Sequence, residues 1–86
     1  MEEGRITGNE LKGKKIVSKT GKYFGTVQDL LFDPKSGEIV YLVVGEASKY
    51  AKSLELERDE NGDILIPFYS VISIGDFVII SEEDLI

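Results

Sequence analysis

The chain has 86 residues, the size of one small domain, and 42% of them are hydrophobic while 30% are charged. This balance is too apolar for a disordered chain, and no apolar run is long enough to cross a membrane, so we expect a folded cytoplasmic protein. Cysteine and histidine are both absent, which excludes disulfides, thiolate nucleophiles, histidine-based triads and ordinary zinc sites. We therefore expect no enzyme, cofactor or metal site.

The net charge of −6 disfavours nucleic acid as a partner, because such binding depends on neutralising phosphates. The charge is unevenly spread, however. Residues 5–28 hold six basic side chains and one acidic one, whereas residues 29–86 hold four basic and thirteen acidic ones. The lysines of the first segment form a candidate basic face: Lys12, Lys14, Lys15, Lys19 and Lys22. The simpler interpretation is that they are the solvated side chains of a hairpin.

Runs of strand-forming residues alternate with turn signals along the whole chain. Strands are predicted at residues 15–18, 23–32, 39–44, 53–57, 64–66, 71–74 and 77–80. The clearest turns are Asp33-Pro34-Lys35-Ser36-Gly37 and the Asn61-Gly62 pair. No stretch has a sustained helical period, and residues 47–52 make either one helical turn or a mobile loop. The pattern predicts an all-β domain, a small antiparallel barrel or sandwich of about six strands.

The second predicted strand changes its inward face along its length. Val27 lies on the odd-numbered face, whereas Leu30 and Phe32 lie on the even-numbered one. If all three point inward, one extra residue must intervene near Gln28-Asp29, as in a β-bulge. The alternative is that Leu31 joins Val27 inside and that other residues cover Leu30 and Phe32.

Three short motifs resemble parts of catalytic or metal-binding sites, but none is complete enough to predict such a site. Lys19-Thr20-Gly21 matches one motif of the serine β-lactamases, but the accompanying S-x-x-K motif is absent. The acidic run from Asp59 to Asp63 resembles the start of an EF-hand loop, but the required Gly and Glu are missing at its sixth and twelfth positions. Asp29 and Asp33 are a conceivable acid–base pair, although turn capping is a sufficient role for Asp33.

Two predicted strands are apolar on both faces, and a small barrel can bury only one face of each. The residues expected to point outward are Ile39, Tyr41, Val43, Phe77 and Ile79. Large apolar patches in water usually mark interaction sites, so these residues are the candidate interface of a homodimer or of another protein partner. The alternative is that residues 46–53 fold over the patch.

The order of residues in GKKIVSKTGKYFGTVQDLLFDPKSGEIVYLVV and ILIPFYSVISIGDFVII resembles the PRC-barrel domain family. The positions that match the family pattern are Gly13, Gly21, Gly25, Val27, Asp33, Gly37, Leu42, Val44, Pro67, Ile74 and Gly75. The resemblance implies a roughly six-stranded barrel without a catalytic constellation. It is strongest to stand-alone PRC-barrel proteins of archaea, some of which are linked to cell division.

These observations predict a non-catalytic interaction and dimerisation module, an adaptor in a cytoplasmic assembly, with residues 11–80 forming the domain. Residues 1–10 are expected to be an extension, and residues 81–86 an acidic tail that frays or serves as a docking peptide. The alternative hypothesis is a ribosome- or RNA-associated assembly factor that uses the basic face. Cell division follows from the resemblance alone.

Overall fold

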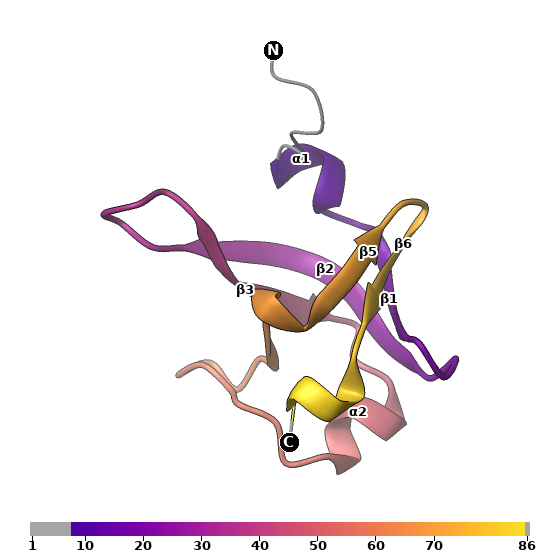
Figure 1. Ribbon diagram of the computed structural model, residues 1–86. Coiled ribbons are helices and arrows are strands. Elements are labelled where there is room, and N and C mark those ends of the chain that lie inside the picture. The colour runs from indigo at the N-terminus through magenta and orange to yellow at the C-terminus, as the bar shows by residue number, and fades with distance from the viewer. Residues whose placement is uncertain (1–7, 86) are drawn as a thin grey trace.

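The computed structural model describes residues 8–85. The elements follow one another as α1 (Gly8–Leu11), β1 (Lys15–Ser18), β2 (Tyr23–Phe32), β3 (Ile39–Gly45), α2 (Lys49–Ser53), β4 (Leu65–Pro67), η1 (Phe68–Ser70), β5 (Val71–Ile74), β6 (Phe77–Ile80) and η2 (Glu82–Leu85), as Figure 1 shows; η denotes a 3₁₀ helix. The predicted all-β class is confirmed. The expected single helical turn near residues 47–52 is α2.

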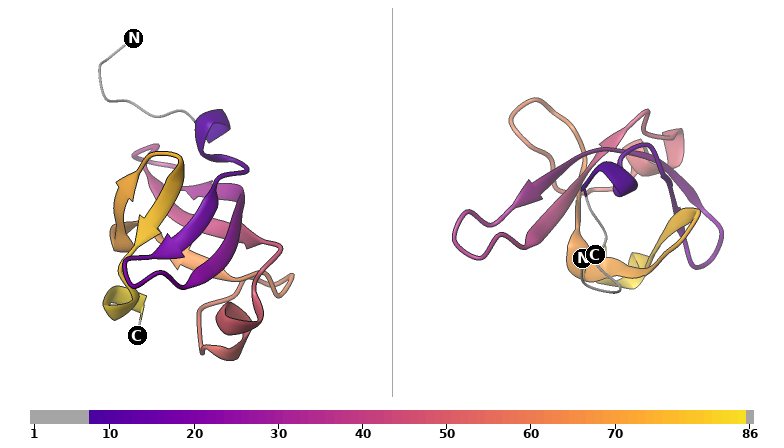
Figure 2. Two further views of the ribbon diagram at one scale, coloured as in Figure 1. Left: turned by 90° about the vertical axis from the view of Figure 1, so that its right-hand side faces the viewer. Right: turned by 90° about the horizontal axis from the view of Figure 1, so that it is seen from above.

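The six strands form one curled sheet in the order β4-β3-β2-β1-β6-β5 (Figure 2). Every neighbouring pair is antiparallel except β1 and β6, which run parallel. The prediction of a wholly antiparallel sheet is therefore wrong at this pair. The sheet is also not closed into a barrel, because β4 and β5 remain its edges and only η1 joins them along the chain.

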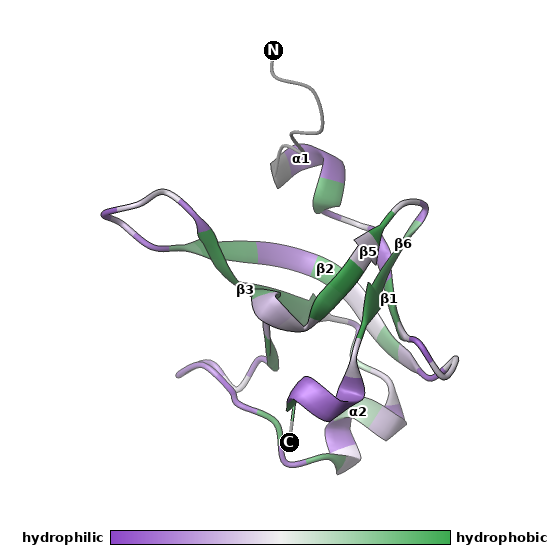
Figure 3. Cartoon of the chain, in the orientation of Figure 1, coloured by the Kyte–Doolittle hydropathy of each residue, from purple (hydrophilic) through white to green (hydrophobic). Residues whose placement is uncertain are grey.

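The core lies on the concave face of this sheet. Phe24, Leu42 and Val78 have no exposed surface, and hydrogen-bonded neighbours on the same face continue the apolar layer from strand to strand. The helices α1 and α2 lie at opposite ends of the curled sheet, where they bury Leu11 and Ala51 completely. Figure 3 shows the apolar residues concentrated on the strands and hydrophilic residues on η2 and the loops.

A bulge lies where the sequence predicts one. The register passes from the pair Val27–Val44 to the pair Asp29–Val43, so Gln28 is the extra residue, and both Val27 and Leu30 are buried. Phe32 is 52% exposed, although it was expected inside with them. The reason is that the hairpin of β2 and β3 extends beyond the rest of the sheet (Figure 1).

The strand predicted at residues 53–57 is wrong. Ser53 ends α2, and the residues after it make only one isolated bridge, between Arg58 and Ile64, together with a 2.8 Å hydrogen bond from the Leu65 amide to the Glu57 carbonyl. Alternation of leucine and glutamate here reflects an extended segment with one side against the core, since Leu54 and Leu56 pack there. Period-2 alternation needs burial on one side but does not need a paired strand.

The end of the chain is packed rather than frayed. Ser81 is 6% exposed, its amide donates a 2.8 Å hydrogen bond to the Ser70 carbonyl, and Leu85 packs against the core. The expectation of a frayed tail is therefore wrong for residues 81–85. At the other end Leu11, the first residue of the expected domain, belongs to the core, and so the packed domain extends past the expected boundary at residue 80.

Candidate functional site

The acidic residues considered for chemistry have structural roles. The Asp33 carboxylate accepts the Lys35 amide at 2.8 Å, which confirms its turn-capping role, and the Asp59 carboxylate accepts the amides of Asn61 and Asp63, both at 2.9 Å. Asp29 lies 3.6 Å from the Lys12 ammonium. Within residues 8–85 no group of three or more acidic side chains is arranged to hold a metal ion.

The five predicted interface residues do not form one surface. In the sheet β3 and β6 are separated by β2 and β1, so Tyr41 and Phe77 lie on different parts of it. Phe77 is 48% exposed and Ile79 is half-buried, whereas Val43 is only 4% exposed. The Tyr41 hydroxyl is held by both Glu57 carboxylate oxygens at 3.0 Å. Val43 therefore offers no docking area, and Tyr41 is half-buried with its hydroxyl already engaged.

A second register shift explains where Ile39 points. Leu31 pairs with Tyr41, and the next residue, Phe32, pairs with Ile39, so Val40 is an extra residue on β3. Because Leu31 and Phe32 face opposite sides of the sheet, their partners do too. Ile39 therefore faces the concave side, where it packs against the core, although plain alternation had placed it beside Tyr41.

The alternative cover for this patch, residues 46–53, packs elsewhere. The helix α2 lies against β2, and the Tyr50 ring meets the Phe24 ring edge-on, with centroids 5.6 Å apart. Val43 instead faces its register partner Leu65 of β4, which is 6% exposed.

One apolar surface lies on the convex side of the sheet, and we call it the β1–β6 face: Val17, Tyr23, Phe77 and Ile79. Val17 is the register partner of both Tyr23 and Ile79, so the three side chains lie in a row across β2, β1 and β6. Phe77 occupies the next row beside Lys15. Tyr23 is 39% exposed and Phe77 is 48% exposed, so the β1–β6 face is accessible.

A second apolar surface is the projecting part of the β2–β3 hairpin, residues 31–40, here called the hairpin arm. Leu31, Phe32 and Val40 are 39%, 52% and 41% exposed. A hollow of about 380 Å³, lined by Glu38, Ile39 and Phe68, lies where the arm meets η1. The sequence did not predict this exposed surface, since Leu31 and Phe32 were expected to be inward-facing or covered; the signal available was that the three residues flank a turn at the end of the longest strand.

Most of the predicted basic face is already engaged within the molecule. The Lys19 ammonium lies 3.3 Å from Glu83, the Lys14 ammonium donates to the Gly75 carbonyl at 2.5 Å, and Lys22 lies over the Tyr50 ring. Lys12 pairs with Asp29, as described above, and Lys15 is exposed beside Phe77. The two ion pairs, Lys12–Asp29 and Lys19–Glu83, are exposed and weak, but they reduce the positive field available to a polyanion.

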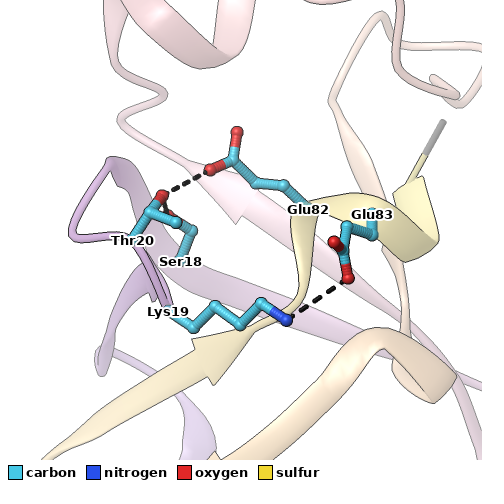
Figure 4. A network of polar contacts seen from close by, with 5 residues as sticks. All are labelled: Ser18, Lys19, Thr20, Glu82 and Glu83. Atoms are coloured by element: carbon cyan, nitrogen blue, oxygen red, sulfur yellow. Dashed lines mark hydrogen bonds and ion pairs between the residues drawn. The ribbon is translucent and has the colours of Figure 1, made fainter.

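Figure 4 shows how the C-terminal turn is fastened to the β1–β2 turn. Thr20 donates to Glu82 at 2.9 Å, and Ser18 and Thr20 share a hydrogen bond of 2.9 Å. The Tyr50 hydroxyl donates to the other oxygen of Glu82. This last bond holds the pKa of Glu82 below its ordinary value and raises the pKa of Tyr50.

A second hollow is open and of mixed charge. It measures about 420 Å³, and its lining includes Glu46, Asp63, Lys52 and Arg58. The opposite charges balance, and the Arg58 guanidinium already donates to the Gly62 carbonyl at 3.2 Å. Its geometry therefore selects no class of ligand.

The model of the PRC-barrel domain family matches residues 3–85. The chain belongs to the PRC-barrel domain family. It is also 35% identical over 72 residues to an uncharacterized protein of the archaeon Methanocaldococcus jannaschii, an alignment that covers 84% of this chain and 76% of the relative. The match is longer than the 11–80 expected, and the packing of Leu85 in η2 agrees with the longer C-terminal boundary.

The PRC-barrel motif positions serve the fold. Gly21, Gly25 and Gly37 all have positive φ, at +93°, +144° and +76°. Of the apolar motif positions, Val27, Leu42 and Val44 are in the core, while Pro67 ends β4 and Gly75 lies in the β5–β6 turn. These residues shape the sheet, and the two exposed apolar surfaces lie largely outside the motif. No helix among the described residues has the length and apolarity needed to cross a membrane.

Proposed function

We propose that this PRC-barrel chain is a non-catalytic protein-interaction module, an adaptor that joins components of a cytoplasmic assembly. The observation that carries the proposal is the presence of two accessible apolar surfaces on separate parts of the sheet, the β1–β6 face and the hairpin arm. An adaptor needs two independent contacts, and exposed apolar surface is where protein partners usually bind.

The β1–β6 face is the proposed site for a different protein. Phe77 and Tyr23 supply the aromatic surface typical of binding hot spots, and Lys14 and Lys15 border it. This combination suits an acidic partner segment with apolar anchors, because the lysines steer the encounter while the aromatic rings are buried. Cell division remains the process suggested by the family resemblance, and identifying the partner tests it.

The test is affinity purification from the native host with three baits: wild type, Phe77→Ser and Tyr69→Ser. Tyr69 is 77% exposed on η1, outside the β1–β6 face, and so serves as the matched control. We expect a protein that is recovered with wild type and with Tyr69→Ser but lost with Phe77→Ser. Equal recovery of the partner protein with all three baits would show that the β1–β6 face is not its binding site.

Salt separates this proposal from the RNA-associated alternative. Capture through phosphate contacts should fall steeply between about 0.05 M and about 0.2 M salt, whereas an apolar interface should persist. Recovery of RNA that is lost in this range and that depends on Lys15 would favour the alternative. The ion pairs of Lys12 and Lys19 and the net charge of −6 are the reasons that we place it second.

A further inference from the structure

We propose that two copies of this chain pair about a twofold axis through their hairpin arms, each Phe32 entering the other copy's hollow beside Ile39 and Phe68. The proposal makes a second copy of the chain one partner of the interaction module proposed above. It rests on that proposed function only for the role that the dimer would serve. Its evidence is the geometry of the arm.

The arm has no strand neighbour on either edge. On one side, β1 pairs with β2 only from Tyr23 to Thr26, and the residues before β1 continue this contact no further than Val27. On the other side, β4 pairs with β3 only from Tyr41 to Val43. An isolated two-stranded ribbon is marginally stable in water, so packing against another surface would stabilise this one.

The arm carries the inner face of the sheet beyond the core. Leu30 and Leu42 are paired, and both are buried. The next pair outward on the same face is Phe32 with Ile39, and there Phe32 is 52% exposed. A phenyl ring in this position faces inward by register but has no opposite wall against which to pack.

The adjacent hollow provides a wall for a second ring. Its volume of about 380 Å³ is larger than that of a cavity of about 150 Å³ that accommodates benzene. Ile39 and Phe68 supply apolar sides, while Glu38 lies at its rim.

The arrangement fits a second copy because the inserting ring and the receiving hollow are neighbours. In a twofold interface the same patch serves both molecules, so each must present the inserting group and its receptor side by side. Phe32 and Ile39 meet this condition as cross-strand partners. The β1–β6 face is a poorer choice for self-pairing, since Lys14 and Lys15 of two copies would be brought together.

Light scattering over a dilution series from high to low micromolar concentration tests the proposal, with Phe32→Ser and the control Phe77→Ser. We expect wild type and Phe77→Ser to have the mass of a dimer at high concentration, and Phe32→Ser about half that mass. Phe32 is exposed, so its loss should leave the circular dichroism spectrum unchanged. A wild-type monomer throughout, or a dimer that survives Phe32→Ser, would overturn the proposal.

Fluorescence gives a second readout, because the chain contains no tryptophan. The emission of Phe32→Trp should shift to shorter wavelength as concentration rises, and that of Phe77→Trp should not. A shift only with Phe77→Trp would assign self-association to the β1–β6 face and overturn the proposal that the hairpin arms pair. Partner capture through Phe77 is measured separately, so failure of the arm and failure of the proposed function remain distinguishable.

Discussion

Gly25 allows β2 and β3 to approach closely within the curled sheet. Its φ is +144°, and a Cβ atom there would lie 2.6 Å from the Gly45 carbonyl oxygen and 2.7 Å from a Val44 methyl group. Both obstacles are rigid, one because it is backbone and the other because it is a core side chain. The position therefore requires glycine for its conformation and for its space.

We predict that Gly25→Ala lowers the free energy of unfolding by about 2–4 kcal/mol, because steric overlap and backbone strain add. The matched control is Gly21→Ala, whose φ is +93° but whose added methyl group meets nothing within 4 Å. Its loss should be about 1 kcal/mol, from strain alone. Urea denaturation measures both, and equal losses would show that the close approach does not matter.

Among the elements, η2 is held in part by polar contacts that depend on protonation. Glu82 accepts from both Tyr50 and Thr20, and the bond from Tyr50 is the main cause of its lowered pKa. A lowered carboxyl pKa adds stability that is present above the unfolded value and is lost as the pH falls through the folded value. The raised pKa of Tyr50 adds stability that is lost as the pH rises through its folded value.

We therefore predict that Tyr50→Phe destabilises the protein between about pH 5 and about pH 9, and that its difference from wild type shrinks in acid as Glu82 gains a proton. The edge-on contact with Phe24 is kept in this variant, so the comparison isolates the hydroxyl. Unfolding by urea at a series of pH values measures the difference. Tyr69→Phe is the control, and a pH-independent effect of Tyr50→Phe would contradict the role of Glu82.

The short helix α1 closes one end of the core through Leu11, which has no exposed surface. We predict that Leu11→Ala lowers the free energy of unfolding by about 2–4 kcal/mol, because it leaves a cavity at that end. Lys12→Ala, which removes only an exposed ion pair, should cost less than about 1 kcal/mol. Similar values for the two variants in chemical denaturation would show that α1 lies outside the cooperative unit.

The sequence predicts most strands because their apolar alternation and their turn residues act locally. It also predicts the bulge at Gln28, because Val27 and Leu30 cannot otherwise both face inward. The bulge at Val40 was missed, since an apolar residue on every position of β3 hides a change of face. The parallel pairing of β1 with β6 was missed as well, because no local signal records a contact between segments about 60 residues apart.

The candidate surfaces were predicted less well than the fold. Phe77 and Ile79 lie on the β1–β6 face, but Ile39 packs inward and Val43 is covered. The packing of η2 depends on Tyr50 and Thr20, which approach Glu82 only in the folded chain. The exposure of a side chain on a strand depends on the curl of the sheet and on where the neighbouring strands end. The alternation of apolar and polar residues within a single strand predicts neither of these.

At the scale of the whole molecule, the hairpin arm and the β1–β6 face point away from different sides of the sheet (Figures 1 and 2). A dimer joined through its arms would keep two β1–β6 faces free. Such a molecule binds a partner array with both faces, and the second contact forms at a high effective concentration.

We predict that wild type is retained on a surface densely coated with the captured partner at least about 100-fold more strongly than Phe32→Ser. On a sparse surface, where only one face engages, the two should bind alike. Surface plasmon resonance at the two densities measures this. A Phe32→Ser protein that matches wild type on the dense surface would show that pairing adds no avidity.

The parallel pairing of β1 with β6 also affects how the domain emerges during synthesis. Among the strands of the described residues β1 is translated first, yet one of its two lateral neighbours, β6, is translated last. Until Ile80 has cleared the exit tunnel, Ile16 lacks Val78 beside it, and one flank of the nascent hairpin stays open to other chains. The sheet can therefore be completed only after β6 has left the tunnel.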